Sequence, residues 1–250
     1  MHILVTNDDS YDSPLLHILH DILIDLGHKL TCVIPASEQS WKGKAMTRFG
    51  KMTVNQVVIG DRTFNTFSGT PADCVNFGIH NLCTEKPELV ISGTNLGYNA
   101  SLGFVFSSGT VGGALEAYLA GVPALSLSQK LNKNEYLYWN KKRKFKQQAK
   151  EKYFLQTKKI LEKISLQNFA KTKDLWALEF PDELSKKWKL CKTYPSFQSY
   201  GSAFSESEDG TYFHNASGLS FNDEEGTDIH ALANGNVALN KLDFKSLFKK

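Results

Sequence analysis

The chain has 250 residues and a mass of 28.0 kDa, and its hydrophobic fraction of 41% and charged fraction of 22% are ordinary for a globular protein. These values exclude a mainly disordered chain, and a formal net charge of +3 is too small to require a nucleic-acid or membrane surface. No apolar stretch approaches the roughly 20 residues of a membrane span, and no basic leader precedes the first strand pattern. We therefore expect a cytoplasmic protein with neither a membrane partner nor a stable nucleic-acid partner.

The first elements form a βαβ unit. Residues 2–6 are the first, hydrophobic strand, and Asp12-Ser13-Pro14 then supplies a helix cap followed by proline at the first helical position. Residues 29–35 are the second strand, so the two strands should be parallel. The four cysteines lack a close CxxC pair, which predicts reduced structural thiols; they are Cys32, Cys74, Cys83 and Cys191.

Another strand and helix follow a predicted hairpin over residues 52–67. Thr70 to Asp73 reads as a capping box that opens a helix. Residues 89–91 are a short buried strand, and the loop 92–99 is too rich in Gly and Asn to continue the sheet. This strand end should bring polar residues to the sheet edge where the first strand ends.

A helix start rich in Ser, Gly and Thr lies at residues 107–113. Free backbone N–H groups, hydroxyls and the positive end of the helix dipole together favour an anion, and phosphate is the natural candidate. The spacing fits neither GxxxxGKS nor GxGxxG, which excludes a nucleotide P-loop and disfavours an NAD-type Rossmann enzyme.

The second half is less regular. A strand at 124–128 precedes a basic run at 141–144, which leads into a predicted helix through residue 164. We interpret the run as a solvated face rather than a nucleic-acid patch. A strand at 174–180 follows, and residues 194–225 suit hairpins or long loops. The predicted fold is α/β, a Rossmann-like, mostly parallel sheet with flanking helices; residues 1–183 form its core and residues 184–250 a hairpin-rich extension for oligomerisation.

Two adjacent carboxylates, Asp8 and Asp9, stop the first strand. Unpaired carboxylates beside a buried strand would take up protons or destabilise the fold, so a cation or several hydrogen-bond donors should hold them. Because ligands bind at the carboxyl ends of strands in open α/β sheets, the pair predicts a metal-assisted active site.

Several motifs in order resemble the SurE family of survival-protein nucleotidases, which are metal-dependent phosphatases of 5′ and 3′ nucleoside monophosphates. Besides Ser40, in the loop after the second strand, the matching stretches are ILVTNDD at 3–9, SGTPADCVN at 68–76, SGTNLGYN at 92–99, SSGTVGGALEA at 107–117 and EGTDIHALANGNVALNKL at 225–242. A strand followed by NDD is weakly informative alone, but the ordered set is highly specific.

The resemblance implies a nucleotidase with one divalent cation per subunit, Mg²⁺ or Mn²⁺, whose activated water attacks phosphorus. It assigns the metal to Asp8, Asp9, Ser40 and Asn95, with the two aspartates as the catalytic pair. It assigns phosphate and substrate binding to Asn7, Asn99, Ser108, Gly109 and Thr110. It also implies a homodimer or tetramer assembled through the distal hairpin. Burial of apolar residues such as Phe197, Tyr200 and Phe204 between chains would support this assembly.

Three positions depart from the family pattern. Ser10 stands where a glycine normally follows the aspartates, which is tolerable if the turn needs no positive φ. Gln39 and Leu96 stand where basic residues are usual, so attraction for dianionic monophosphates should be weaker or a different substrate preferred. The alternative hypothesis is therefore a catalytically weakened phosphate-ligand binding protein on the same scaffold.

Simpler structural roles stay open for each motif. The aspartate pair could only cap a turn, Asn95 and Asn99 could only suit left-handed turn geometry, and the start at Ser108 could only be a helix cap. Two distal histidines, His214 and His230, are not proposed as an acid/base pair, because nothing in their spacing connects them to the strand ends.

Overall fold

The structure is a computed structural model, and it describes residues 1–199, 202–215, 220–221 and 223–244. Its core is a nine-stranded sheet in the order β3-β4-β2-β1-β5-β6-β7-β13-β8. Its strands are β1 His2–Thr6, β2 Lys29–Pro35, β3 Val54–Ile59, β4 Arg62–Phe67, β5 Leu89–Leu96, β6 Ala124–Gln129, β7 Leu175–Phe180, β8 Leu190–Thr193 and β13 Val237–Lys241. The strands from β4 to β7 in this order pair in parallel, and β3 and β13 pair antiparallel to β4 and β7.

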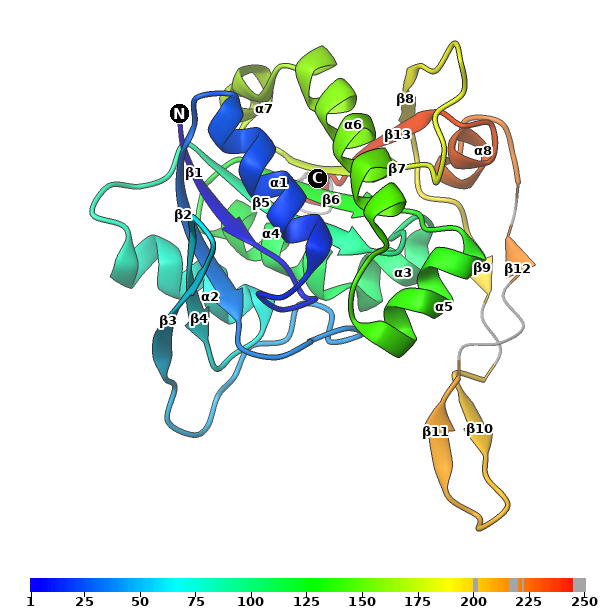
Figure 1. The fold of residues 1–250 in the computed structure, drawn as a ribbon, viewed down its shortest axis with the longest axis horizontal. Helices are drawn as coiled ribbons and strands as arrows, with labels where there is room; N and C mark the ends of the chain where they lie inside the picture. The colour runs from blue at the N-terminus through cyan, green and yellow to red at the C-terminus, as the bar shows by residue number, and fades with distance from the viewer. Residues whose placement is uncertain (200–201, 216–219, 222, 245–250) are drawn as a thin grey trace, which may run out of the picture.

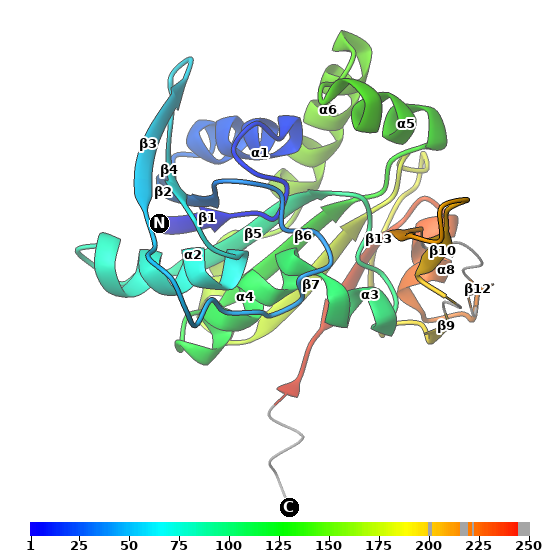
Figure 2. The ribbon, with the colours of Figure 1, turned by 90° about the horizontal axis from the view of Figure 1, so that it is seen from below.

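Helices cover both faces of this sheet (Figure 2). They are α1 Pro14–Asp25, α2 Pro71–Phe77 with a π-helical turn Gly78–Leu82, α3 Leu102–Ser107, α4 Gly109–Leu119, α5 Lys133–Lys142, α6 Gln147–Lys163, α7 Leu166–Thr172 and α8 Asp228–Ala233. None of the helices in the described part of the chain is long and apolar enough to span a membrane.

Strand β1 shows how the sequence divides the core into layers. Ile3 and Val5 belong to the apolar cluster on the side of α1 and α6, whereas Leu4 belongs to the cluster with α2 and α4. Successive strand residues point to opposite faces, so an uninterrupted apolar run fits a strand that is covered on both sides. The prediction of a mostly parallel α/β sheet is confirmed.

The distal part of the chain contributes to two places. Strands β8 and β13 join the central sheet, so that sheet draws on both of the segments expected at 1–183 and 184–250. Outside it, β9 Gln198–Ser199 pairs with β12 Ser220–Phe221, and β10 Phe204–Glu206 pairs with β11 Tyr212–His214. The β10–β11 hairpin extends beyond the body of the molecule (Figure 1), which confirms the predicted C-terminal hairpin.

Local predictions near the site hold with one correction. Thr70 and Asp73 form the predicted capping box, because the Thr70 hydroxyl accepts from Asp73 N at 3.2 Å and the Asp73 carboxylate accepts from Thr70 N at 2.9 Å. The prediction that residues 92–99 leave the sheet is wrong, because β5 continues to Leu96 with a register shift between Ser92 and Asn95. The helix predicted from the basic run to residue 164 is confirmed as α6, and the run itself contains the end of α5, whose C-cap Arg143 has a φ of +51°.

Candidate active site

The site lies where the strand order reverses. Strand β1 has β2 on one side and β5 on the other, and Thr6 pairs with Ser92 at the end of the parallel register. Helices leave these two strands toward opposite faces of the sheet, which opens a crevice at their carboxyl ends. Asp8 and Asp9 follow β1 directly into this crevice, with 3% and 5% of their surfaces exposed.

Asp8 is held by the start of α4. The Thr110 hydroxyl donates to Asp8 Oδ1 at 2.5 Å, and Gln39 N donates to the Asp8 carbonyl at 2.7 Å. Gly109 is needed for this approach, because a Cβ there would lie 2.9 Å from Asp8 Cβ. Burial raises the pKa of Asp8, and the hydroxyl and backbone amide of Thr110 partly oppose that rise.

Asp9 is held by β5. Its Oδ2 accepts a hydrogen bond from Leu96 N at 2.8 Å. Burial, followed by the negative charge of Asp8, raises the pKa of Asp9 well above its usual range. Two buried neighbouring carboxylates repel each other and lack water, so a cation placed between them would favour the ionised form of both.

The loop after β2 adds a third carboxylate that the sequence did not single out. Ser40 Oγ donates to Glu38 Oε1 at 3.0 Å, and the Glu38 carboxylate pairs with Arg143 at 3.0 Å. Glu38 also contributes to the raised pKa values of Asp8 and Asp9. Residues 141–144 are exposed, as expected of a solvated face, and Arg143 among them also pairs with Glu38 at the rim of the site.

Asn95 reaches the site because of the irregularity in β5. One extra residue between the pairs Ser92–Ser126 and Asn95–Ser128 shifts the strand, as bulges next to active sites often do. The Asn95 side-chain amide donates to Gly97 O at 2.9 Å, which fixes the amide plane. Its oxygen accepts no hydrogen bond from the described residues and is free to bind a ligand.

These side chains fit a hard divalent cation. Carboxylate, amide and hydroxyl oxygens are the ligands that Mg²⁺ and Mn²⁺ prefer, and each hydrogen bond to Asp8 and Asp9 uses one oxygen of its carboxylate. No cluster of three or more His, Cys, Asp or Glu side chains suited to a metal occurs among the described residues. The proposed set thus depends on Ser40 and Asn95 as well as on the carboxylates.

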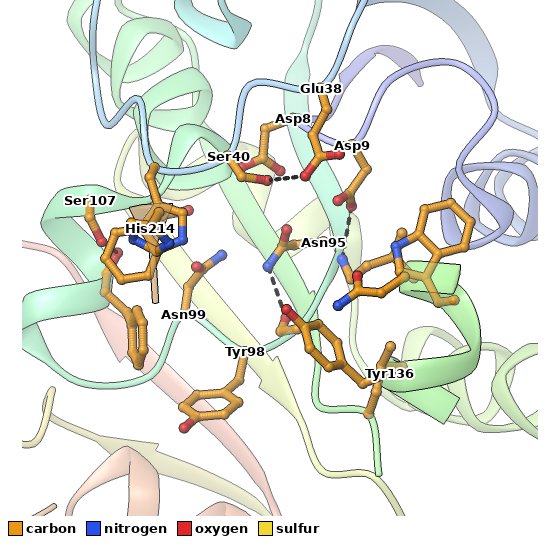
Figure 3. A pocket seen from close by; sticks show the side chains of 18 of the residues that line it. Asp8, Asp9, Glu38, Ser40, Asn95, Tyr98, Asn99, Ser107, Tyr136 and His214 are labelled. Carbon is orange, nitrogen blue, oxygen red and sulfur yellow. Dashed lines mark hydrogen bonds between the residues drawn. The ribbon is translucent and has the colours of Figure 1, made fainter. Parts of the chain in front are cut away.

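A cavity of about 630 Å³ opens over these residues (Figure 3). Four expected ligands, Asp8, Asp9, Ser40 and Asn95, line it together with Glu38. The remaining lining residues are Trp41, Leu96, Gly97, Tyr98, Asn99, Phe104, Ser107, Ser108, Leu131, Lys133, Tyr136, Trp139, Asn140 and His214. The volume lies in the range of small-molecule pockets and exceeds what a metal ion and a phosphate would fill.

The five residues expected to bind phosphate divide into two groups. Asn99 and Ser108 line the cavity; Asn99 Nδ2 donates to Ser128 Oγ at 2.9 Å, and Ser108 caps α4 by accepting from Val111 N at 3.1 Å. The other three, Asn7, Gly109 and Thr110, are buried beside the lining residues. Gly109 and Thr110 pack on Asp8 and hold that carboxylate in place.

The turn after the carboxylates differs from expectation. Ser10 has φ +76°, so this turn does need the left-handed region that glycine adopts most easily. Asn7 Nδ2 donates to Ser10 O at 2.8 Å and closes the turn from inside. The buried Asn7 Oδ1 has no hydrogen-bond partner among the described residues. A serine is thus held in a strained conformation beside the metal-binding candidates.

Aromatic residues complete the walls of the cavity. The Trp41 ring lies 5.7 Å from the Phe104 ring and 4.5 Å from the His214 ring. His214 therefore lines the cavity although it comes from the distal hairpin, and only the folded chain reveals this proximity. His230 instead lies 3.0 Å from Asp223 and does not line the cavity.

A mostly parallel α/β sheet with two buried carboxylates at its switch point defines a Rossmann-like α/β protein. Comparison with known proteins gives the family. The chain matches the family described as "Survival protein SurE" over residues 3–200. It therefore belongs to the SurE family, as the ordered motifs predict.

Individual relatives cover nearly the whole chain. A protein named "5'-nucleotidase SurE" from Thermofilum pendens is 30% identical over 250 residues, covering 99% of this chain and 92% of the relative. A protein of the same name from Campylobacter jejuni is 35% identical over 240 residues, covering 93% and 88%. The crystal structure of a SurE protein from Aquifex aeolicus has a TM-score of 0.70 at 25% identity, covering 99% of this chain and 96% of that chain.

Proposed function

We propose that the protein is a divalent-metal-dependent phosphomonoesterase that hydrolyses nucleoside 5′- and 3′-monophosphates to nucleoside and phosphate. The observation that carries the proposal is the pair of buried carboxylates at the switch point, facing the free amide oxygen of Asn95 in one cavity. Relatives named 5'-nucleotidase SurE, similar over nearly the full chain, support the substrate class.

One Mg²⁺ or Mn²⁺ ion per subunit would be held by Asp8, Asp9, Ser40 and Asn95. When bound, such an ion supplies Lewis-acid polarisation of a phosphoryl oxygen and lowers the pKa of water. The hydrogen bonds from Thr110 and from Leu96 N keep the two carboxylates in place for this task.

The chain's own groups account for binding and proton transfer. Either aspartate can orient the attacking water and accept its proton, because both carboxylates lie at the cavity. The amino end of α4, capped by Ser108, presents the positive end of its dipole next to Asp8. Asn99 lines the same cavity and offers polar contacts to the substrate.

The test measures phosphate release by the purified protein, first after a chelator has removed divalent metal and then after Mn²⁺ or Mg²⁺ has been added back. Hydrolysis of nucleoside monophosphates with Mn²⁺ or Mg²⁺, and none with chelator, is the expected result. Asp9→Asn should abolish turnover with an unchanged circular dichroism spectrum. Asp12→Asn is the matched control, because Asp12 is exposed and lies outside the cavity lining. A broad panel of phosphomonoesters left intact by the metal-loaded protein would contradict the proposal.

A phosphatase with altered substrate preference, or a phosphate-ligand binding protein with weak turnover, is the second candidate. Leu96 lines the cavity with an apolar side chain, and the Gln39 side chain bonds back to Ser37 Oγ at 3.2 Å. Neither position brings a cation to the phosphate. Calorimetric binding of a nucleoside monophosphate without turnover would favour the binding protein, whereas robust turnover would exclude it.

We further propose that the distal hairpin assembles the chain into a homodimer or tetramer. Phe197 and Phe204 are 70% and 59% exposed, and the neighbouring Tyr212 and Phe213 are 66% and 51% exposed. Tyr200, the third residue of that expectation, lies outside the described residues. Light scattering should give a mass at least twice 28.0 kDa, and a monomer at micromolar concentration would contradict this assembly.

A further inference from the structure

One face of α5 forms a wall of the cavity that the proposed chemistry does not use. Lys133, Tyr136 and Asn140 are spaced by three and four residues, so they lie on the same helix face, and all three line the cavity. Figure 3 shows Tyr136 and His214 on opposite sides of the cavity, with Asn95 between them. The face therefore looks onto the same space as the proposed metal ligands.

These three side chains are available to a ligand. Within the described part of the chain, Lys133, Tyr136 and Asn140 make no side-chain hydrogen bond, ion pair or ring contact, and 46% of the Tyr136 surface is exposed. Other residues of α5 are engaged elsewhere: Tyr138 lies under the Lys146 amine at 5.1 Å, and Trp139 lies under the Arg143 guanidinium at 4.3 Å.

The helix that carries this face is well anchored. Asn132 caps it by accepting from Glu135 N at 3.0 Å, and Glu135 accepts a hydrogen bond from the Tyr153 hydroxyl on α6. Trp139 is 3% exposed and packs edge-on to Phe145 at 6.1 Å. A ligand would therefore meet a preformed surface, and little ordering would be needed on binding.

The charges around the cavity give Lys133 a distinct role. Asp8 and Asp9 lie at its base, and Glu38 at its rim is paired with Arg143. Among the described lining residues, Lys133 is the one lysine or arginine. It supplies positive charge to a cavity in which Gln39 and Leu96 bring none.

We propose that the α5 face is the nucleoside subsite: Tyr136 stacks on the base, Asn140 bonds the base edge, and Lys133 attracts the phosphate. This inference rests on the proposed nucleotidase function and names the part of the chain that recognises the leaving group. An unpaired aromatic ring beside an amide and a cation matches a planar, hydrogen-bonding base attached to an anion.

The first test separates the base from the phosphate. Tyr136→Ala should raise KM for adenosine 5′-monophosphate about tenfold, the scale of one stacking contact, while KM for ribose 5-phosphate stays within twofold. Leu137→Ala is the matched control, because Leu137 is on the same helix, 54% exposed and absent from the cavity lining. Equal effects of Tyr136→Ala on both substrates, or no effect on either, would overturn the subsite.

The second test needs no turnover and so separates failure of this inference from failure of the proposed function. Equilibrium dialysis of adenosine against the metal-free protein should show binding that Tyr136→Ala weakens about tenfold. Unchanged binding in the variant, or no binding to the wild-type protein at millimolar adenosine, would contradict the inference. Loss of hydrolysis with adenosine binding intact would instead refute only the nucleotidase proposal.

A third test concerns the positive charge of Lys133. Lys133→Met should raise KM for both phosphate esters at low ionic strength, with a smaller rise at high salt, and leave adenosine binding unchanged. Lys142→Met is the control, because Lys142 is exposed on the same helix away from the cavity. An unchanged KM in Lys133→Met would remove Lys133 from the subsite.

Discussion

A buried carboxyl group behind the active site makes the stability of the protein depend on pH. Glu179 in β7 is fully buried; its Oε2 accepts a hydrogen bond from Asn99 N at 2.8 Å, and its Oε1 has no partner among the described residues. Burial, together with the charge of Asp228, raises the pKa of Glu179 to about 8. Because Asn99 lines the cavity, this group also supports the site.

The size and sign of the effect follow from that pKa. Between the usual value of 4.5 and about 8, the folded protein binds one proton more than the unfolded chain, so stability falls as pH rises through this window. At about 1.36 kcal/mol per pH unit, the loss between pH 5 and pH 8.5 is about 4 kcal/mol. Glu179→Gln keeps an oxygen for Asn99 N and cannot ionise, so it should remove this loss.

Urea unfolding of both proteins at pH 5 and pH 8.5 measures the difference directly. The variant should match the wild-type protein closely at pH 5 and exceed its unfolding free energy by several kcal/mol at pH 8.5. Other groups that titrate, including Asp8 and Asp9, are common to both proteins and cancel in the comparison. A difference between the proteins that stays constant with pH would refute the assignment.

Three further substitutions test single contacts. Thr110→Val removes the hydroxyl bonded to Asp8 and should weaken Mn²⁺ binding about tenfold in a calorimetric titration, whereas equal affinity would show that the contact does not position the carboxylate. Thr70→Ala breaks the capping box of α2 and should cost about 1 kcal/mol in urea unfolding, and no loss would count against that cap. Arg143→Ala leaves Glu38 unpaired at the rim, so KM for dianionic monophosphates should rise at low salt and recover as salt screens the repulsion. A KM of Arg143→Ala that does not change with salt would show that repulsion by Glu38 is not the cause.

The elements near the amino terminus were predictable because local chemistry decides them. Pro14 at the first turn of α1 and the Thr70 capping box act within a few residues, and the uninterrupted apolar run of β1 marks a strand covered on both faces. The edge at which Asp8 and Asn95 meet follows from parallel pairing. Ser13 shows the limit: it is the N-cap of α1, yet its side chain makes no capping hydrogen bond.

The parts that sequence reasoning missed depend on contacts between distant segments. The bulge that extends β5 to Leu96 is fixed by pairing with β6, which outweighs the turn preference of Gly and Asn. Glu38 joins the site through the fold of the loop after β2. Arg143 pairs with Glu38 at the rim and His214 lines the cavity, and both lie more than 100 residues beyond Asp8 and Asp9 in the sequence, so no local spacing could reveal them.

The most direct test of the central proposal is the binding of a divalent cation at the carboxylate pair. Calorimetric titration of Mn²⁺ into chelator-treated protein should show one ion per chain for the wild type and for Asp12→Asn, and at least a hundredfold weaker binding for Asp9→Asn. Nucleoside monophosphate hydrolysis should appear with the same Mn²⁺ dependence. Equal Mn²⁺ affinity in wild type and Asp9→Asn would contradict the proposed metal site, and with it the function built on it.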